Sequence, residues 1–155
     1  MIRQLQPLDK EKLCLLSEQI NRDHYINMPN DFREPDGSDR DWEHWQSFAD
    51  DASSIFLVAE RDGNVEGFIA CRVIKSGNAS YLIQKTKLQI STIVVLPSAQ
   101  RKDIGRKLVE AAIREAKELG ATEAFLEVMS YNVDAQKFYE ALGFDDFSKK
   151  MSFQF

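Results

Sequence analysis

The sequence has few of the residues that build metal centres and disulfide frameworks: its 155 residues include two cysteines and two histidines. Cys14 and Cys71 lie far apart in apolar contexts, without the CxxC spacing of metal or redox motifs, so we expect both to be buried thiols. His24 and His44 are too far apart to form an HExxH pair. We therefore predict no metal site, and we expect both histidines to be surface or packing residues.

Linkers, repeats and long apolar runs are also missing. With four prolines, seven glycines and 43% hydrophobic residues, the composition predicts one domain over 1–155. The longest stretch without a charge, 88–100, has 13 residues, well short of the roughly 20 apolar residues that a membrane span needs. Residues 1–12 carry charges at Arg3 and over 9–12 and lack the apolar core of a secretory signal, so we expect a cytoplasmic protein without a membrane partner.

Positive charge is in deficit. The chain has 20 Lys and Arg against 25 Asp and Glu, for a net charge of -5 and a pI near 5.1. Nucleic-acid binding requires clustered Lys and Arg against phosphates, so this balance argues against a nucleic-acid partner. Cationic or neutral partners are favoured.

Hydrophobic periodicity predicts two helices followed by a hairpin. Apolar residues recur at offsets of three and four over 9–21, and aromatic residues do so over 41–49. Two β-branched and aromatic runs, 55–60 and 65–73, then flank Asp62-Gly63. Because this pair suits the positive φ angles of a tight turn, we expect two antiparallel strands.

The second half of the chain alternates strand and helix patterns. In order, these are a strand region from about 81 to 96 after a turn at 76–79, a helix from 104 to 116 stopped by Gly120, a buried strand over 124–129, a helix over 135–142 ended by Gly143, and an edge strand over 147–155. The middle three form a βαβ unit, whose strands should be parallel. The predicted fold class is α/β, with a mixed, mostly antiparallel sheet flanked by helices.

A short basic loop joins the strand ending near residue 96 to the helix beginning at 104. It places four positive charges within seven residues: Arg101, Lys102, Arg106 and Lys107. Free N–H groups at a helix N-terminus attract anions, and phosphate is the natural ligand; from the charges alone, a solvated helix end is the alternative. The P-loop, Rossmann and α/β-hydrolase motifs (GxxxxGKS/T, GxGxxG and GxSxG) do not occur in the sequence.

Two blocks resemble the GNAT superfamily of acyl-CoA-dependent N-acetyltransferases. The loop Gln100-Arg101-Lys102-Asp103-Ile104-Gly105 follows a Val-x-Pro strand end and is similar to the family's cofactor loop, Q/R-x-x-G-x-G/A. About 30 residues on, the segment from Asn132 to Phe144 looks like the family's N-x-x-A-x-x-F-Y-E-x-L-G-F. The resemblance is specific over about 92–144, and its order of elements extends over most of the chain.

The resemblance implies a GNAT-like fold and transfer of an acetyl group from acetyl-CoA to a primary amine, by direct attack in a ternary complex. Backbone groups near Val95 would hold the pantetheine arm, Asn132 would contact the cofactor arm, and Tyr139 would reach the sulfur. The CoA pyrophosphate would be cradled by the amides of Gln100, Arg101, Lys102, Asp103, Ile104, Gly105 and Arg106. From the residues alone, Asn132 could instead cap the last helix and Tyr139 could be a packing aromatic.

The sequence departs from the family pattern at two places. Asp103 replaces the first loop glycine, and its carboxylate could compete for the amides two and three residues on; with four cations and Gly105 present, we expect CoA to bind and Asp103 to point outward. Many relatives carry a Glu on the preceding strand, but residues 84–100 contain no Asp or Glu. The proton acceptor stays open between a carboxylate from the N-terminal half and a water relayed by Gln89, Ser91 or Thr92.

The acceptor amine is not identified by the sequence. Residues 31–51 carry eight acidic side chains against Arg33 and Arg40. In relatives this region borders the acceptor site, so a cationic acceptor is one interpretation, and an ordinary solvated acidic loop is the other.

Two further classes of function stay open. The missing strand carboxylate and Asp103 also fit a non-catalytic acyl-CoA-binding or partner-sensing module of the same fold. A structural protein without a cofactor is the third class. Phe147, Phe153 and Phe155 could pack internally or form the interface of a homodimer.

Overall fold

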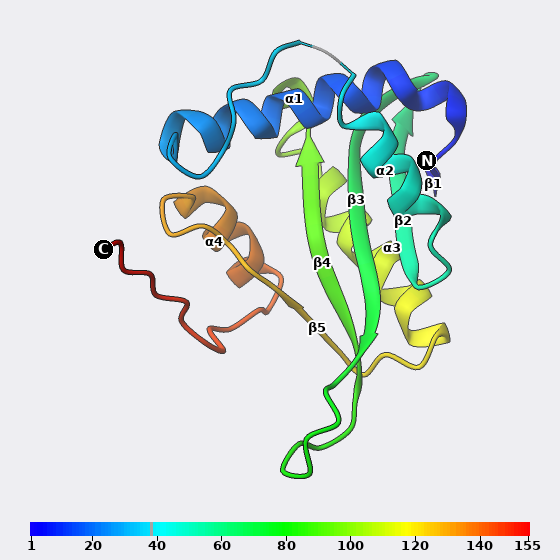
Figure 1. Cartoon of the computed structure of the whole chain (residues 1–155). Coiled ribbons are helices and arrows are strands. Elements are labelled where there is room, and N and C mark those ends of the chain that lie inside the picture. The colour runs from blue at the N-terminus through cyan, green and yellow to red at the C-terminus, as the bar shows by residue number, and fades with distance from the viewer. Residues whose placement is uncertain (38) are drawn as a thin grey trace.

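The computed structural model describes residues 1–37 and 39–155 (Figure 1). One sheet contains, in this order, β1 (Ile2–Gln4), β2 (Ser54–Arg61), β3 (Asn64–Lys75), β4 (Thr86–Val95) and β5 (Glu123–Leu126). Neighbouring strands from β1 to β4 pair antiparallel, whereas β4 and β5 pair parallel. The structure thus confirms the mixed, mostly antiparallel sheet and the parallel βαβ unit.

The β2–β3 hairpin closes at the predicted pair of residues. Asp62 has φ of 50° and Gly63 has φ of 77°. A two-residue turn with both angles positive matches the right-handed twist of the flanking strands, and glycine and aspartate are among the residues that adopt it most readily.

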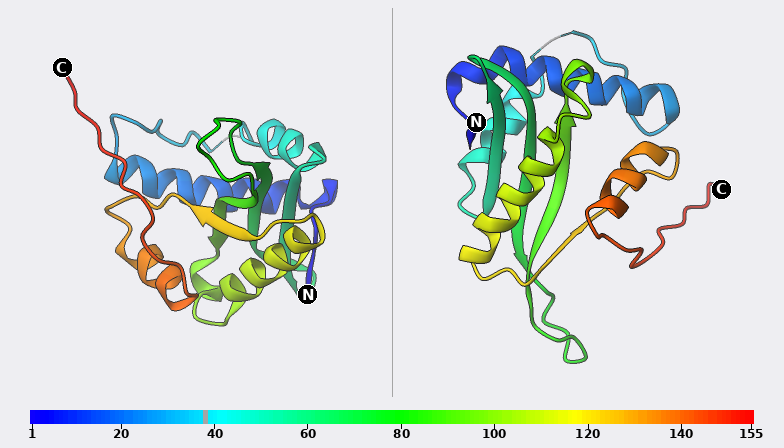
Figure 2. Two further views of the ribbon diagram at one scale, coloured as in Figure 1. Left: turned by 90° about the horizontal axis from the view of Figure 1, so that it is seen from below. Right: turned by 180° about the vertical axis from the view of Figure 1, so that it is seen from behind.

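Helices cover both faces of the sheet. Figures 1 and 2 show α1 (Lys10–Asn27) and α2 (Trp42–Asp50) on one face and α3 (Ile104–Glu118) on the other, while α4 (Val133–Ala141) follows β5. Predicted helix ends at Gly120 and Gly143 are confirmed, with φ of 86° and 94°. In the described ranges, 1–37 and 39–155, no helix is long and apolar enough to cross a membrane.

Each face of the sheet has its own apolar core. Leu108 and Ala112 of α3 are fully buried against one face, with Ile69 of β3. On the other face, Leu13 of α1 and Trp45 of α2 enclose a second cluster. The apolar residues of α1 and α2 recur at helical spacing, as the sequence predicts. Both helices therefore pack their apolar sides against this face of the sheet.

Three predicted elements need correction. The strand region predicted to begin near residue 81 begins at Thr86, and the strand predicted over 124–129 ends at Leu126 and is only half buried. The predicted edge strand over 147–155 does not form. Alternating Phe and Met residues suit a strand, but a strand also needs a hydrogen-bonded neighbour, and 147–155 makes no backbone hydrogen bond to any residue of the described chain.

The C-terminal segment is instead extended and exposed. Phe147, Phe153 and Phe155 are at least 85% exposed. The contacts of this segment with the sheet region are an ion pair from Lys150 to Glu127 (3.5 Å) and the Phe147 ring near the Lys87 ammonium.

Candidate active site

A bulge in β4 opens the sheet between β4 and β5. The register of β4 against β3 shifts so that Ser91 has no partner on β3. Pairing between β4 and β5 ends at Ile90 and Leu126, directly before this bulge. The two strands then diverge (Figure 1), because a bulge bends its strand and increases the local twist. The β5 side of residues 91–95 is therefore left without a pairing strand among the described residues, and an extended ligand can lie along it.

Gln100 closes the turn that leads from β4 to α3. Its backbone N–H donates to the carbonyl oxygens of Leu96 (3.0 Å) and Pro97 (3.3 Å). Its side-chain Nε2 donates to the carbonyl oxygen of Val95 (3.2 Å). The Gln100 amide that we expected on the pyrophosphate is therefore already bonded, and so is the Val95 carbonyl. Gln100 shapes the loop, and the free amides begin one residue later.

Six consecutive backbone N–H groups, those of residues 101–106, donate no hydrogen bond within the described part of the chain. The first hydrogen bond of α3 runs from the Lys107 N–H to the Asp103 carbonyl (2.9 Å). Arg101 and Asp103 have φ of 60° and 59°, and successive N–H groups around left-handed residues form anion-binding concavities. Together with the positive end of the α3 dipole, this run suits a diphosphate.

Asp103 leaves these amides free. Its left-handed conformation explains why a glycine suits this position in the family pattern, and aspartate tolerates the conformation better than most side chains. The carboxylate is exposed and accepts no hydrogen bond from the first turn of α3.

The four basic side chains of the loop surround the free amides. Arg101, Lys102, Arg106 and Lys107 are all exposed, and none forms an ion pair with a described residue. Their charge is therefore available to an anionic ligand. Ile104 is 7% exposed and belongs to the core, and Gly105 lies against Phe138 of α4, so these two residues offer backbone rather than side chain.

Asn132 caps α4. Its Oδ1 accepts a hydrogen bond from the N–H of Ala135 (3.1 Å), which satisfies one of the free donors of the first helical turn. The Nδ2 group of Asn132 has no partner in the described chain. The same side chain can thus hold the helix with its oxygen and donate to a ligand with its nitrogen.

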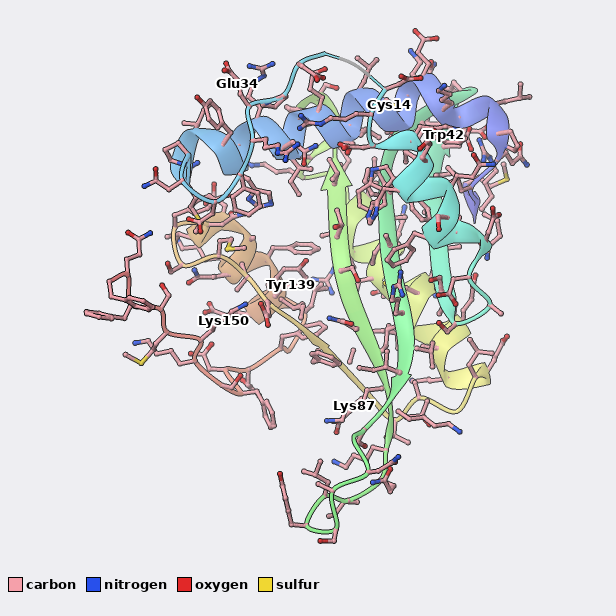
Figure 3. All side chains as sticks on the ribbon, in the orientation of Figure 1. Cys14, Glu34, Trp42, Lys87, Tyr139 and Lys150 are labelled. Carbon is pink, nitrogen blue, oxygen red and sulfur yellow. The ribbon has the colours of Figure 1, made fainter. Side chains whose placement is uncertain are left out.

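Tyr139 lies on the side of α4 that faces β4 (Figure 3). The residue is 9% exposed and packs edge-on against Phe138 and Phe144. Its hydroxyl makes no hydrogen bond to a described residue and is not among the fully buried atoms, so it reaches solvent. Burial, helped by the nearby Cys71, raises the pKa of Tyr139. The hydroxyl therefore keeps its proton and can donate a hydrogen bond.

The two cysteines differ in burial. Cys71 is completely buried, and burial raises the pKa of its thiol to about 12. Cys14 is only half buried, which corrects the expectation of two buried thiols.

The structure brings together a pair of side chains that sequence reasoning missed. His24 Nδ1 lies 2.5 Å from the hydroxyl of Tyr131, although 107 residues separate them. His24 stacks on Phe32, with ring centroids 4.6 Å apart. This histidine is neither free on the surface nor simply packed, and the signal that could have found it is the unbroken helical sequence from 10 to 27, which extends α1 past the predicted end.

A cavity of about 370 Å³ lies beside this pair. Its lining residues are Asn21, Phe32, Arg33, Arg40 and Asp41. One oxygen of the Asp41 carboxylate accepts hydrogen bonds from Asn21 (2.5 Å) and Ser17 (2.8 Å). These bonds fix the start of α2 to α1, and they hold Asn21 and Asp41 in place at the cavity.

The acidic residues of 31–51 do not form one open patch. Asp39 pairs with Lys10, Asp51 with Arg72, and both Asp36 and Asp41 with Arg40. Because half of the eight carboxylates have basic partners, charge steering of a cationic acceptor is weaker than their number suggests.

Comparison with known proteins identifies the family of this chain. The sequence profile of the Acetyltransferase (GNAT) family matches residues 18–144. The streptothricin acetyltransferase of Streptomyces lavendulae is 34% identical over 110 residues, which cover 71% of this chain and 54% of that protein. The N-alpha-acetyltransferase of Sulfurisphaera tokodaii is 36% identical over 98 residues, covering 60% and 58%. The chain spans about half the length of the curated relatives it matches.

Solved structures share the fold. A mutant of a Bacillus halodurans protein has a TM-score of 0.93 at 21% identity, covering 100% of this chain and 99% of that one. An aminoglycoside N-acetyltransferase bound to a CoA bisubstrate analogue has a TM-score of 0.77 at 21% identity, covering 99% and 96%. These likenesses place the molecule among acetyltransferase folds. Since the profile covers most of the chain, the protein belongs to the GNAT family of acetyltransferases.

Proposed function

We propose that this protein is an acetyl-CoA-dependent N-acetyltransferase that acts on a primary amine by direct attack in a ternary complex. The observation that carries the proposal is the run of six unbonded amides at 101–106, surrounded by four basic side chains without ion-pair partners in the described chain. The site has the donors and the charge that a diphosphate requires.

Each residue of the site has a role in the proposed reaction. The amides of 101–106 hold the pyrophosphate, and the open side of β4 from Ser91 to Val95 receives the pantetheine arm. Asn132 donates to that arm through Nδ2. Acetyl-CoA supplies the thioester carbonyl, and Tyr139 donates a hydrogen bond to the sulfur as negative charge develops there, which is the kind of stabilisation that lowers the barrier.

The acceptor must lose a proton before it attacks. A lysine-like ammonium has a pKa of about 10.4, so deprotonation at pH 7 costs roughly 4.6 kcal/mol. We place the acceptor in the cavity beside Phe32 and Asp41. One relative is named a streptothricin acetyltransferase, and one protein of similar fold is named an aminoglycoside N-acetyltransferase. Both names favour an amine acceptor.

The test is acetyl transfer to a panel of amines: a polyamine, an aminoglycoside and a peptide with a free N-terminus. We expect release of the CoA thiol and a mass increase of one acetyl group on at least one acceptor. Arg101→Glu should weaken acetyl-CoA binding, because it reverses a charge beside the amides. Lys117→Glu makes the same charge change at the other end of α3 and is the matched control.

The alternative is an acyl-CoA-binding module without turnover. The observation that favours it is the absence of Asp and Glu from residues 84–100. A thermal shift with acetyl-CoA but no thiol release with any amine would support this alternative. No thermal shift at all would reject both proposals, since a ligand that binds the native state must stabilise it.

A further inference from the structure

Three side chains form a hydrogen-bonded chain at the end of α1. The hydroxyl of Tyr131 lies 2.5 Å from Nδ1 of His24 and donates to Oδ2 of Asp23 (3.4 Å). When the hydroxyl proton points to Asp23, the phenol oxygen can accept from an Nδ1–H. The neutral imidazole then has no proton on Nε2. This is the arrangement of a base whose second nitrogen is held by an orienting partner.

The hydrogen bonds among Asp23, His24 and Tyr131 span the opening between β4 and β5. Asp23 and His24 belong to α1, which packs on the sheet, whereas Tyr131 belongs to the connection from β5 to α4. Tyr131 directly precedes Asn132, the cap of the helix that carries Tyr139. The contact therefore joins the two sides of the opening that β5 leaves when it diverges from β4.

Phe32 connects the imidazole of His24 to the proposed acceptor cavity. Phe32 stacks on His24 at 4.6 Å and also lines the 370 Å³ cavity. Asn21, one turn before His24 on α1, lines the same cavity. His24 thus lies next to the cavity wall formed by Phe32 and contacts the connection that holds Asn132.

We propose that His24 is the general base of the acetyl transfer and accepts a proton from the acceptor ammonium at Nε2, while Tyr131 and Asp23 orient its ring. This inference rests on the proposed function. It answers the question left by residues 84–100, which contain no Asp or Glu to accept that proton. Tyr131 and Asp23 act through His24 and are positioning residues.

The protons and electrons of the step balance. The ammonium gives one proton to His24 Nε2, and the nitrogen lone pair forms the new C–N bond to the thioester carbonyl carbon. The C–S bond breaks with its electron pair on sulfur, and the thiolate takes the second proton of the nitrogen to leave as CoA thiol. The third proton stays on the amide, and His24 returns its proton to solvent.

The surroundings of His24 suit this role at neutral pH. Burial lowers the pKa of His24, and the negative charge of Asp23 opposes this effect only in part. Two other side chains contact the ring: Tyr131 on the β5–α4 connection and Phe32 after α1. Both are uncharged. The imidazole is therefore mostly neutral at pH 7 and ready to accept a proton.

The experiment compares His24→Gln with His44→Gln, the matched change at the other histidine of the chain. With acetyl-CoA and the best acceptor of the amine panel, His24→Gln should lower kcat roughly a hundredfold, within the range for loss of a general base. The acetyl-CoA thermal shift should be unchanged. The wild-type rate should level off above the pKa of His24, whereas the His24→Gln rate should keep rising with pH toward the pKa of the ammonium.

Two further variants separate catalysis from structure. Imidazole added to His24→Ala should restore part of kcat, which a lost packing contact would not allow. Tyr131→Phe removes the orienting oxygen and should lower kcat and move the inflection of the pH profile without changing acetyl-CoA binding. The inference is overturned if His24→Gln keeps the wild-type kcat and pH profile. If the wild-type protein binds acetyl-CoA but acetylates no amine, the proposed function itself fails.

Discussion

Gly105 of α3 and Phe138 of α4 touch where the two family-like blocks of sequence meet. A Cβ atom placed on Gly105 would lie 3.0 Å from Cζ of Phe138, closer than side chains normally approach. The glycine therefore lets α4 pack beside the start of α3. Since α4 carries Tyr139 and α3 begins with the free amides, this contact fixes the distance between the sulfur end and the phosphate end of the proposed cofactor site.

Gly105→Ala should destabilise the protein by about 1 kcal/mol. Crowding against Phe138 costs roughly 1 to 3 kcal/mol, and the better helix propensity of alanine recovers up to about 1 kcal/mol. Urea unfolding measures the change. The double variant Gly105→Ala/Phe138→Leu should be more stable than Gly105→Ala alone. Gly77→Ala, whose Cβ would make an ordinary 3.6 Å contact, is the control and should change little.

Asp103→Asn should tighten acetyl-CoA binding roughly two- to fivefold, because a charge at an exposed helix start contributes about 0.3 to 1 kcal/mol. The substitution keeps a side chain that tolerates the left-handed φ of 59°, so the effect isolates the charge. Calorimetric titration at low and high salt checks it, and the gain should shrink as salt rises. Equal affinities at low salt would show that the exposed carboxylate does not face the diphosphate.

Local residue patterns predicted the parts of the fold that depend on local conformation. Asp62-Gly63 indicated the hairpin because a tight turn needs positive φ at both positions and these two residues adopt it readily, and the apolar stripe of α3 indicated its buried face. Available amides were predicted over 100–106 at the junction of one strand end and one helix start, and the structure leaves those of 101–106 unbonded within the described chain. These features need only neighbours in sequence.

Features that depend on distant partners were not predictable in this way. The last turns of α1, from Arg22 to Asn27, have no apolar stripe that packs in the core, and their contact with Tyr131 depends on the distant β5–α4 connection. The unbroken helical sequence could have extended α1 to His24, but nothing in the sequence indicated the contact of His24 with Tyr131. The 147–155 segment was instead predicted as a strand that does not form. Its alternating pattern suits a strand, but the pattern cannot supply the neighbouring strand to which it would bond.

Asn132→Ala and Asn132→Asp should separate capping from cofactor binding. Loss of the hydrogen bond from Ala135 should cost Asn132→Ala about 1 kcal/mol of stability. Asn132→Asp keeps an oxygen acceptor and should stay as stable as the wild type. Both variants lose Nδ2, so both should bind acetyl-CoA more weakly. If only the less stable variant binds weakly, Asn132 acts through the helix alone.

The ion pair of Arg3 and Asp9 should make stability depend on pH. The two side chains form paired hydrogen bonds of 2.7 and 2.8 Å, and these bonds with Arg3 hold the pKa of Asp9 below its ordinary value. The stabilisation is complete above the ordinary aspartate pKa of about 3.9 and is lost as pH falls through the lower pKa of the folded state.

Asp9→Asn should therefore lower the free energy of unfolding by about 2 to 3 kcal/mol at pH 7, because it leaves Arg3 with less charge compensation in a partly buried site. Below pH 4 the difference from the wild type should shrink. Denaturant unfolding across pH measures both effects. Asp146→Asn, at an exposed position, is the control and should leave the pH dependence as it is.

Tyr139→Phe should lower kcat roughly ten- to a hundredfold and change acetyl-CoA affinity little. The variant keeps the ring that packs against Phe138 and Phe144, and it removes only the donor that meets charge developing on sulfur. Tyr81→Phe, at a side chain that is 85% exposed, controls for the loss of a hydroxyl. Because the pKa of Tyr139 is raised, the wild-type pH profile should show no loss of activity from its ionisation up to about pH 10. Equal losses in kcat and in acetyl-CoA affinity would instead mean that the hydroxyl supports the fold of the site and not the departing thiolate.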